Sequence, residues 1–93
     1  KDLPKVPFGE LVEQGLIPPG SILSDVKNQF KAKVKIDGTI FVDDLKGSIH
    51  KVGASLQGLQ NCNGWDYWHL IKKKNRLSID NIRSQYRIKK LLK

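Results

Sequence analysis

The chain has 93 residues, of which 39% are hydrophobic and 28% are charged, and its formal net charge is +8. This length allows one domain with a single small core. No stretch approaches the roughly 18 apolar residues of a membrane-spanning helix. The single cysteine, Cys62, excludes an internal disulfide framework and is typical of the reducing cytoplasm.

The positive charge is distributed unevenly. Residues 1–70 hold eight Lys and eight Asp or Glu, whereas residues 71–93 hold nine Lys or Arg and one acid, Asp80, so the whole excess of +8 falls there. A concentrated positive field attracts phosphate backbones and releases their counterions, so this pattern indicates nucleic-acid binding. A basic tail that only aids solubility is the alternative.

The chain is expected to begin with an extended linker over residues 1–7, because Pro4 and Pro7 oppose helix formation. A short helix is predicted from Phe8 to Gln14, with Gly15 as its C-terminal stop. Because the chain begins with Lys rather than Met, we expect it to be a fragment of a longer protein.

Strands are predicted next, at residues 21–26, 30–36 and 39–43. The middle one alternates lysines with apolar residues, which predicts a half-buried strand whose inner face is Phe30, Ala32, Val34 and Ile36. Asp37-Gly38 predicts a two-residue hairpin turn. That turn would pair Val34 with Phe41 and place Ile40 on the lysine face. Either something covers that face or the turn is longer, and we expect partial cover.

The second half predicts a loop at residues 43–47 and a helix from Ile49 to Gln57, with Ser48 as N-cap and Gly58 as its stop. Ile49, Val52, Gly53 and Leu56 form its inner face, and His50, Lys51, Ala54 and Gln57 lie away from it.

The rest of the chain predicts a loop at residues 59–64 and two strands at 65–71 and 76–79. A final helix is predicted to be capped by Ser78 or Asp80 and to end near Leu92. These elements predict a single α+β domain with a small antiparallel sheet and two or three short helices.

The sequence offers little for catalysis. His50, His69 and Cys62 do not have the spacing of a zinc site, and there is no glycine-rich phosphate loop. The carboxylates of Asp43-Asp44 are neighbours that point apart in extended chain. Ser48 and His50 lack the sharp turn of a nucleophile. We therefore predict no catalytic and no metal-ligating residue.

Three clusters predict DNA contacts instead. The first is Ser48, His50 and Lys51 at a helix N-terminus, where free N–H groups and the helix dipole suit a phosphate. An ordinary N-cap with an exposed histidine is the alternative.

The second cluster is Asn61, Asn63 and Trp65. Asparagine can pair with adenine or hold a phosphate, and tryptophan can stack on an unpaired base. Trp65 and Trp68 would point to opposite faces of a strand, so we expect Trp68 in the core and Trp65 partly exposed. A plain turn beside two core tryptophans is the alternative.

The third cluster is the basic stripe of Arg83, Arg87 and Lys90 on the last helix, which would supply phosphate contacts without sequence preference. Such a helix also suits a membrane surface, an acidic partner or plain solvent. A separate basic hairpin tip is predicted at residues 72–76.

The chain also resembles a known family, through VPFGELVEQGLIPPGSIL, KAKVKIDGTI, GSIHKVGASLQG and CNGWDYWH. These strings are similar to the C-terminal RAMA domain (restriction enzyme and adenine methylase associated) of HinfI-type and CcrM-type DNA adenine methyltransferases. The resemblance covers about residues 6–83 and fits less well after Asn81.

The resemblance implies that residues 8–93 form a domain that binds double-stranded DNA, and the DNA strands could be locally separated. Residues 1–7 would be the linker from an N-terminal catalytic domain, which would also be a partner of this domain. That domain would use S-adenosylmethionine to methylate a flipped adenine in GANTC. This chain would need no cofactor and have no methylase activity alone, since Pro18-Pro19 lacks the flanking residues of an Asp/Asn-Pro-Pro-Tyr motif. The family signature falls on Gly47, Ser48, His50, Lys51, Asn63, Gly64, Trp65 and Trp68.

Other partners remain open. The domain could dock on its own catalytic domain or form a homodimer, with the two tryptophans at a protein interface. Binding of RNA or single strands by stacking is a third possibility. We expect no membrane partner and a location in the bacterial cytoplasm with the nucleoid.

Overall fold

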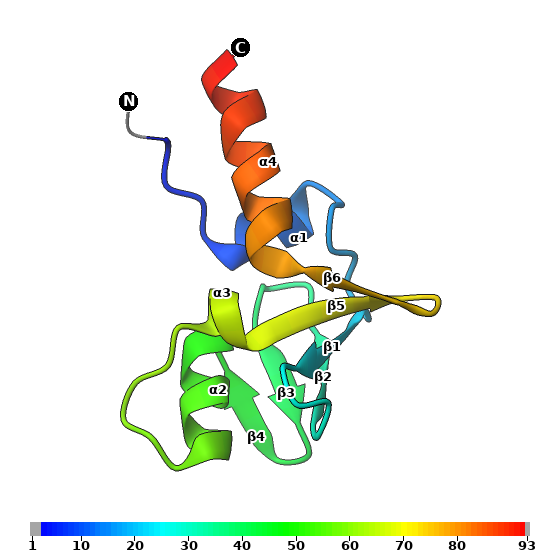
Figure 1. Ribbon diagram of the computed structural model, residues 1–93, viewed down its shortest axis with the longest axis vertical. Helices are drawn as coiled ribbons and strands as arrows, with labels where there is room; N and C mark the ends of the chain where they lie inside the picture. The colour runs from blue at the N-terminus through cyan, green and yellow to red at the C-terminus, as the bar shows by residue number, and fades with distance from the viewer. Residues whose placement is uncertain (1–2, 93) are drawn as a thin grey trace.

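A computed structural model describes residues 3–92, which form six strands and four helices (Figure 1). In chain order they are α1 (Phe8–Glu13), β1 (Ile22–Asp25), β2 (Lys31–Val34), β3 (Ile40–Val42), β4 (Leu45–Gly47), α2 (Ile49–Gln57), α3 (Gly64–Tyr67), β5 (Trp68–Lys72), β6 (Asn75–Ser78) and α4 (Ile79–Leu92). The predicted α+β class is confirmed, with one more helix than expected. No helix in this part of the chain has the length and apolar character needed to cross a membrane.

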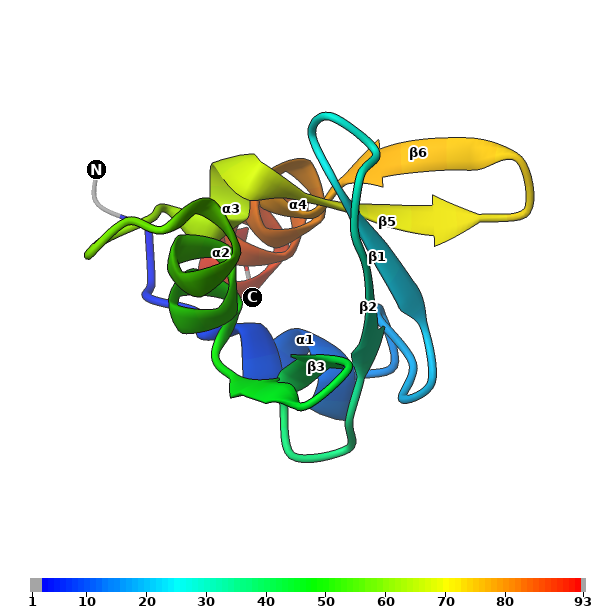
Figure 2. The ribbon, with the colours of Figure 1, turned by 90° about the horizontal axis from the view of Figure 1, so that it is seen from below.

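The strands form one antiparallel sheet in the order β4-β3-β2-β1-β5-β6. The sheet is strongly curved, and the helices gather on its concave side (Figure 2). Side chains alternate between the two faces of each strand, so one face contacts the helices and the other faces outward. The outward face is called the outer face below.

The core fills the space between the concave face and the helices. At its centre, the indole of Trp68 is fully buried, and its Nε1–H donates to the carbonyl oxygen of Ile49 at 2.9 Å. Val6, from the segment before α1, is also buried there. Other fully buried side chains are Leu11, Ile17, Leu23, Ile40, Val52 and Ile79.

The β2–β3 turn is longer than predicted. Val34 pairs with Ile40, and the N–H of Lys35 donates to the carbonyl of Thr39 at 2.8 Å, which leaves a three-residue turn. Gly38 has φ +84° there, a conformation that favours glycine. Ile40 is consequently buried without any cover over the lysine face. Ile36, predicted to be internal, is 81% exposed at the turn.

The segment predicted as a loop at residues 43–47 contains strand β4. Asp43 takes φ +52°, a left-handed conformation that Asp tolerates, and the chain reverses tightly between Val42 and Leu45. Asp43 and Asp44 lie in the turn, as predicted, and the error is confined to the three residues of β4 that follow.

The strand predicted from Trp65 begins instead at Trp68, after the helical turn α3. Asn63 induces this turn, since its side-chain oxygen accepts the N–H of Trp65 at 3.1 Å. The two tryptophans therefore do not alternate across a strand. Both are buried, with exposed fractions of 7% for Trp65 and 0% for Trp68.

The predicted ends of α2 and the start of α4 are confirmed. The Ser48 hydroxyl accepts the N–H of Lys51 at 3.0 Å, and Gly58 ends α2 with φ +69°. The Ser78 hydroxyl caps α4 by accepting the N–H of Asn81 at 3.0 Å. Ala54 was predicted to lie away from the core but is buried, and it lines a pocket with Leu59 and Asn61 of the following loop.

Candidate nucleic-acid interface

Four of the predicted contact residues meet where α2 begins. Ser48, His50, Lys51 and Asn61 are all exposed and line one open pocket of about 410 Å³, between α2 and the loop of residues 59–63. The helix and the loop thus bring together the residues that sequence analysis had placed in two separate clusters. We call this group the α2 corner.

A hydrogen bond fixes the orientation of His50. Its Nδ1 accepts the backbone N–H of Gly64 at 2.9 Å, so in the neutral ring Nε2 carries the proton. Gly64 packs closely on α2, because a Cβ there would lie 2.6 Å from the carbonyl carbon of Ile49. The α2 corner therefore presents a donor at a defined place.

Asn63 and Trp65 have internal roles. Besides capping α3, the Asn63 amide donates to the carboxylate of Asp66 at 3.1 Å. Trp65 packs against Phe8, with ring centroids 6.0 Å apart, and its expected partial exposure is wrong. The family-signature tryptophans thus occupy the core, which leaves no tryptophan surface for base stacking.

The basic stripe of α4 is largely paired within the domain. Arg87 donates from Nε to the carbonyl of Pro4 at 2.8 Å, and Lys90 forms a salt bridge with Glu10 at 2.8 Å. Arg83 forms a salt bridge with Asp80. Arg87 and Lys90 hold the N-terminal segment and α1 against α4 through contacts remote in sequence, whereas the Arg83 salt bridge lies within α4.

The Glu10 carboxylate is the acceptor of this contact between α1 and α4. The Lys90 ammonium and the Tyr86 hydroxyl donate to its Oε2 at 2.8 and 2.7 Å. These hydrogen bonds, first that of Lys90 and then that of Tyr86, lower the pKa of Glu10. The charged form of the carboxylate is therefore favoured in the folded domain.

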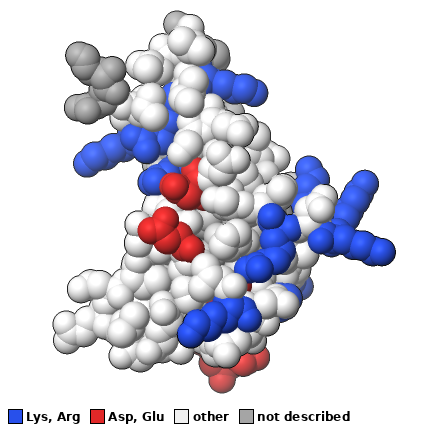
Figure 3. All heavy atoms as spheres, viewed as in Figure 1, with Lys and Arg blue, Asp and Glu red and all other residues white. Residues whose placement is uncertain are grey.

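The outer face of the sheet carries cations from distant strands. Lys33 lies beside Phe41 and Phe41 beside Lys46 on one flank, and Ile71 lies beside Arg76 on the other. Lys31 occupies a second outward position of β2. Figure 3 shows basic side chains gathered on the right of the view, over the β5–β6 hairpin and the strands below it.

These residues are missing from the sites predicted by sequence analysis. The signal was present in the alternation of residues 30–36, which set lysines on one face, and in the basic hairpin at 72–76. Joining the two required the strand order, because β1 and β5 bring them onto one surface.

His69 also lies on the outer face, between Ser24 and Ser78 on the neighbouring strands. Its Nδ1 is buried and has no hydrogen-bond partner among the described residues. Burial, and then the positive charge of Arg76, lower the pKa of His69, so the ring is neutral at neutral pH. No group of three or more metal-ligating side chains occurs in residues 3–92.

Cys62 lies at the edge of the α2 corner. Burial raises the pKa of its thiol, and its Sγ accepts from the Gln57 amide at 3.4 Å. The thiol is thus protonated at neutral pH, as expected of a packed cysteine rather than a reactive one.

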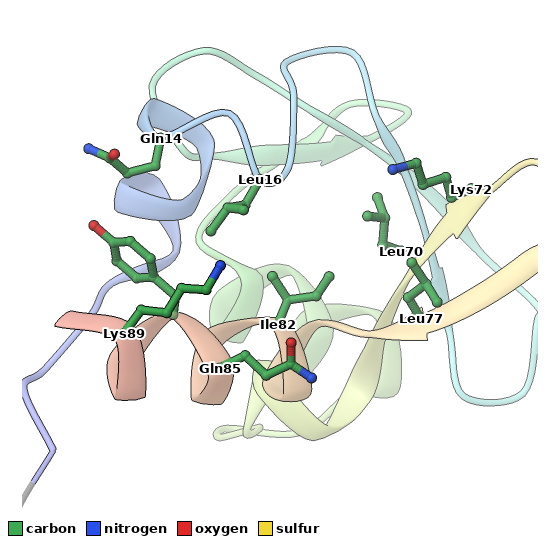
Figure 4. A pocket seen from close by; sticks show the side chains of 9 residues that line it. Gln14, Leu16, Leu70, Lys72, Leu77, Ile82, Gln85 and Lys89 are labelled. Carbon is green, nitrogen blue, oxygen red and sulfur yellow. The ribbon is translucent and has the colours of Figure 1, made fainter. Parts of the chain in front are cut away.

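An apolar groove of about 430 Å³ lies between the end of α1, the β5–β6 hairpin and α4 (Figure 4). Leu16 and Leu77 are 42% and 38% exposed there, and Ile82 contributes to the lining. Lys72 and Lys89 lie on its rim. The groove provides apolar surface at a place that the sequence did not indicate.

Comparison with known proteins identifies the family of the chain. Residues 1–91 match the family described as "Restriction Enzyme Adenine Methylase Associated", or RAMA. The chain is 34% identical over 83 residues to a protein of Haemophilus influenzae named "Type II methyltransferase M.HinfI". That alignment covers 89% of this chain and 23% of the relative, so the chain spans under a quarter of its length. The chain therefore belongs to the RAMA family.

Proposed function

We propose that this domain binds double-stranded DNA as an accessory module of an adenine-specific DNA methyltransferase. The supporting observation is positive charge that the fold does not pair. The net charge is +8, yet the described residues contain only two salt bridges, formed by Arg83 and Lys90. Because phosphate is the polyanion that such an enzyme meets on its substrate, this excess favours DNA as the ligand.

The domain would add affinity and orientation to a catalytic domain elsewhere in the protein. That catalytic domain would bind S-adenosylmethionine and transfer its methyl group to adenine within GANTC, the target implied by the family resemblance. The exposed side chains of the α2 corner, Ser48, His50, Lys51 and Asn61, form one candidate surface for DNA. The outward-facing cations of the sheet form another. Asn63, Trp65, Arg83, Arg87 and Lys90 would act by holding the fold.

Fluorescence anisotropy tests the proposal. The 93-residue chain is titrated into a GANTC duplex, a scrambled duplex and a single strand, each at several salt concentrations. We expect binding to both duplexes, with an affinity that falls steeply and linearly on a log–log plot against salt. No binding to any of these ligands at low salt would contradict the proposal.

A second function is favoured by the apolar groove. Apolar surface is exposed in the groove by Leu16 and Leu77 and on α4 by Ile88, Leu91 and Leu92. Such a surface suits a protein partner, either the catalytic domain or a second copy of the chain. Sedimentation velocity at several protein concentrations tests this option. A concentration-dependent dimer without DNA affinity would favour an interaction module over a DNA-binding one.

A further inference from the structure

We infer that duplex DNA lies on the outer face of the curved sheet, where Lys33, Lys46 and Arg76 contact its phosphate backbone. This inference rests on the proposed function and gives it a location that neither the family match nor the predicted site residues supply. The outward positions of the described strands hold four cations and no Asp or Glu, the cations being Lys31, Lys33, Lys46 and Arg76.

The register aligns three of these cations in one row across all six strands. In order from β4 to β6, the row is Lys46, Phe41, Lys33, Ile22, Ile71 and Arg76. Neighbouring strands lie about 4.8 Å apart, which places Lys33 roughly 10 Å from Lys46 and roughly 14 Å from Arg76. These separations are comparable with the major-groove width of about 12 Å. Cations on both flanks of the convex sheet can therefore reach phosphates on both DNA strands.

Two of the basic side chains are held in place before any ligand binds. Arg76 donates from Nη2 to the carbonyl of Asp25 at 2.9 Å, and Lys31 donates to the Asn28 side chain at 2.9 Å. The buried Asp25 carboxylate fixes the β1–β2 turn by accepting two backbone N–H groups. An arginine that is already ordered loses less side-chain entropy on binding a phosphate.

The α4 stripe and the α2 corner are weaker candidates. On α4, Arg83 and Lys90 are paired with carboxylates and Arg87 with backbone carbonyls. The α2 corner contributes one lysine, Lys51, to its pocket. The outer face thus has more cations than the α2 corner, and two of them, Lys33 and Lys46, form no side-chain hydrogen bond or salt bridge among the described residues, unlike the three cations of the α4 stripe.

Asp37 offsets part of the charge at one edge of the outer face. Hydrogen bonds from Thr39, together with the nearby charges of Lys46 and Lys35, lower the pKa of Asp37, so it is ionised at neutral pH. The unopposed part of the row accordingly runs from Lys33 to Arg76. We expect this part to contribute most to affinity.

Recognition on this face would be of the backbone rather than of bases. Single-strand binding relies on exposed aromatic rings, whereas both tryptophans are buried. Phe41 is the aromatic residue of the row, and it is half-buried with the Lys35 ammonium 5.8 Å from its ring centroid. The surface is therefore suited to a duplex, with little preference among sequences.

Charge reversal tests the location. One double variant carries Lys33→Glu and Lys46→Glu on the outer face. The matched control carries Lys5→Glu and Lys89→Glu, which change the net charge by the same amount at exposed residues outside the outer face. We expect the outer-face pair to bind a duplex at least about tenfold more weakly at low salt. The milder pair Lys33→Gln with Lys46→Gln should reduce the log–log salt slope by about 2, one unit for each lost phosphate contact. Circular dichroism and Tm verify the fold of each variant.

The possible outcomes separate location from function. Near wild-type binding by the control and weak binding by the outer-face pair supports the inference. Equal losses in both pairs overturn it, because net charge alone would then set the affinity. If the wild-type chain binds but the outer-face pair binds equally well, DNA lies elsewhere and the proposed function stands. If the wild-type chain binds no duplex, both fail.

Discussion

The guanidinium carbon of Arg83 lies 4.2 Å from the ring centroid of Trp65, and this stacking closes α4 over α3. The same arginine forms a salt bridge with Asp80. Two residues that looked like DNA contacts in the sequence are therefore joined to each other. Substitution of either residue is expected to weaken DNA binding only by destabilising the fold. Substitution of the outer-face cations should weaken it directly.

Replacement of Trp65 by alanine should reduce the free energy of unfolding by about 3–5 kcal/mol, because it leaves a large cavity beside Phe8. Urea denaturation measures this loss. Trp65→Phe, which keeps most of the apolar contact, serves as the control and should lose less. A stable, folded Trp65→Ala variant that has lost only DNA affinity would instead make Trp65 a direct contact.

Gly64→Ala should also destabilise the domain, by about 1–3 kcal/mol. The added Cβ would lie 2.6 Å from the carbonyl carbon of Ile49, so α3 must move away from α2 and the bond between Gly64 N–H and His50 must lengthen. Thermal unfolding checks this, with the exposed Ser55→Ala on α2 as control. An unchanged Tm would show that α3 is not packed as closely as described.

The contact between Glu10 and Lys90 predicts a dependence of stability on pH. Because hydrogen bonds from Lys90 and Tyr86 lower the pKa of Glu10 from its ordinary value of 4.5, its contribution is complete above that value. This contribution is lost as pH falls through the lower folded-state pKa. The Tm advantage of wild type over Glu10→Gln should be constant near pH 7 and shrink below about pH 4.5. Glu13→Gln, which removes the same charge on α1, should not show that advantage.

His69 should titrate below its ordinary pKa of 6.5, because burial and Arg76 both disfavour the charged ring. The unfolded chain then binds the proton more readily, so stability falls as pH drops below 6.5. NMR of the imidazole carbon-bound protons measures this pKa. Binding of DNA phosphates to the outer face should raise it, whereas binding at the α2 corner should leave it unchanged.

Elements with local signals were predictable from the sequence. Ser48 and Gly58 set the ends of α2 through a side-chain cap and a left-handed residue, both of which are readable in a single stretch of chain. The predicted secondary structure was wrong where the backbone conformation or capping of a single residue determined the element that follows. The positive φ of Asp43 created β4, and the capping by Asn63 turned a predicted strand into α3.

Burial and pairing across the sequence were not predictable in the same way. Trp65 is buried by Phe8 and Arg83, and Arg87 is engaged by Pro4, contacts that no local pattern encodes. The lysine alternation in β2 was visible, but its continuation to Arg76 depends on β1 and β5 lying between the two hairpins. Strand order thus converts two scattered charge patterns into one surface.

The most direct test of where DNA binds is an NMR titration of the isotopically labelled chain with a short GANTC duplex. Placement on the outer face predicts that the backbone amide signals of Lys33, Lys46 and Arg76, with that of His69, shift most. Dominant shifts at His50, Lys51 and Asn61, or around Leu16 and Leu77 in the apolar groove, would contradict it.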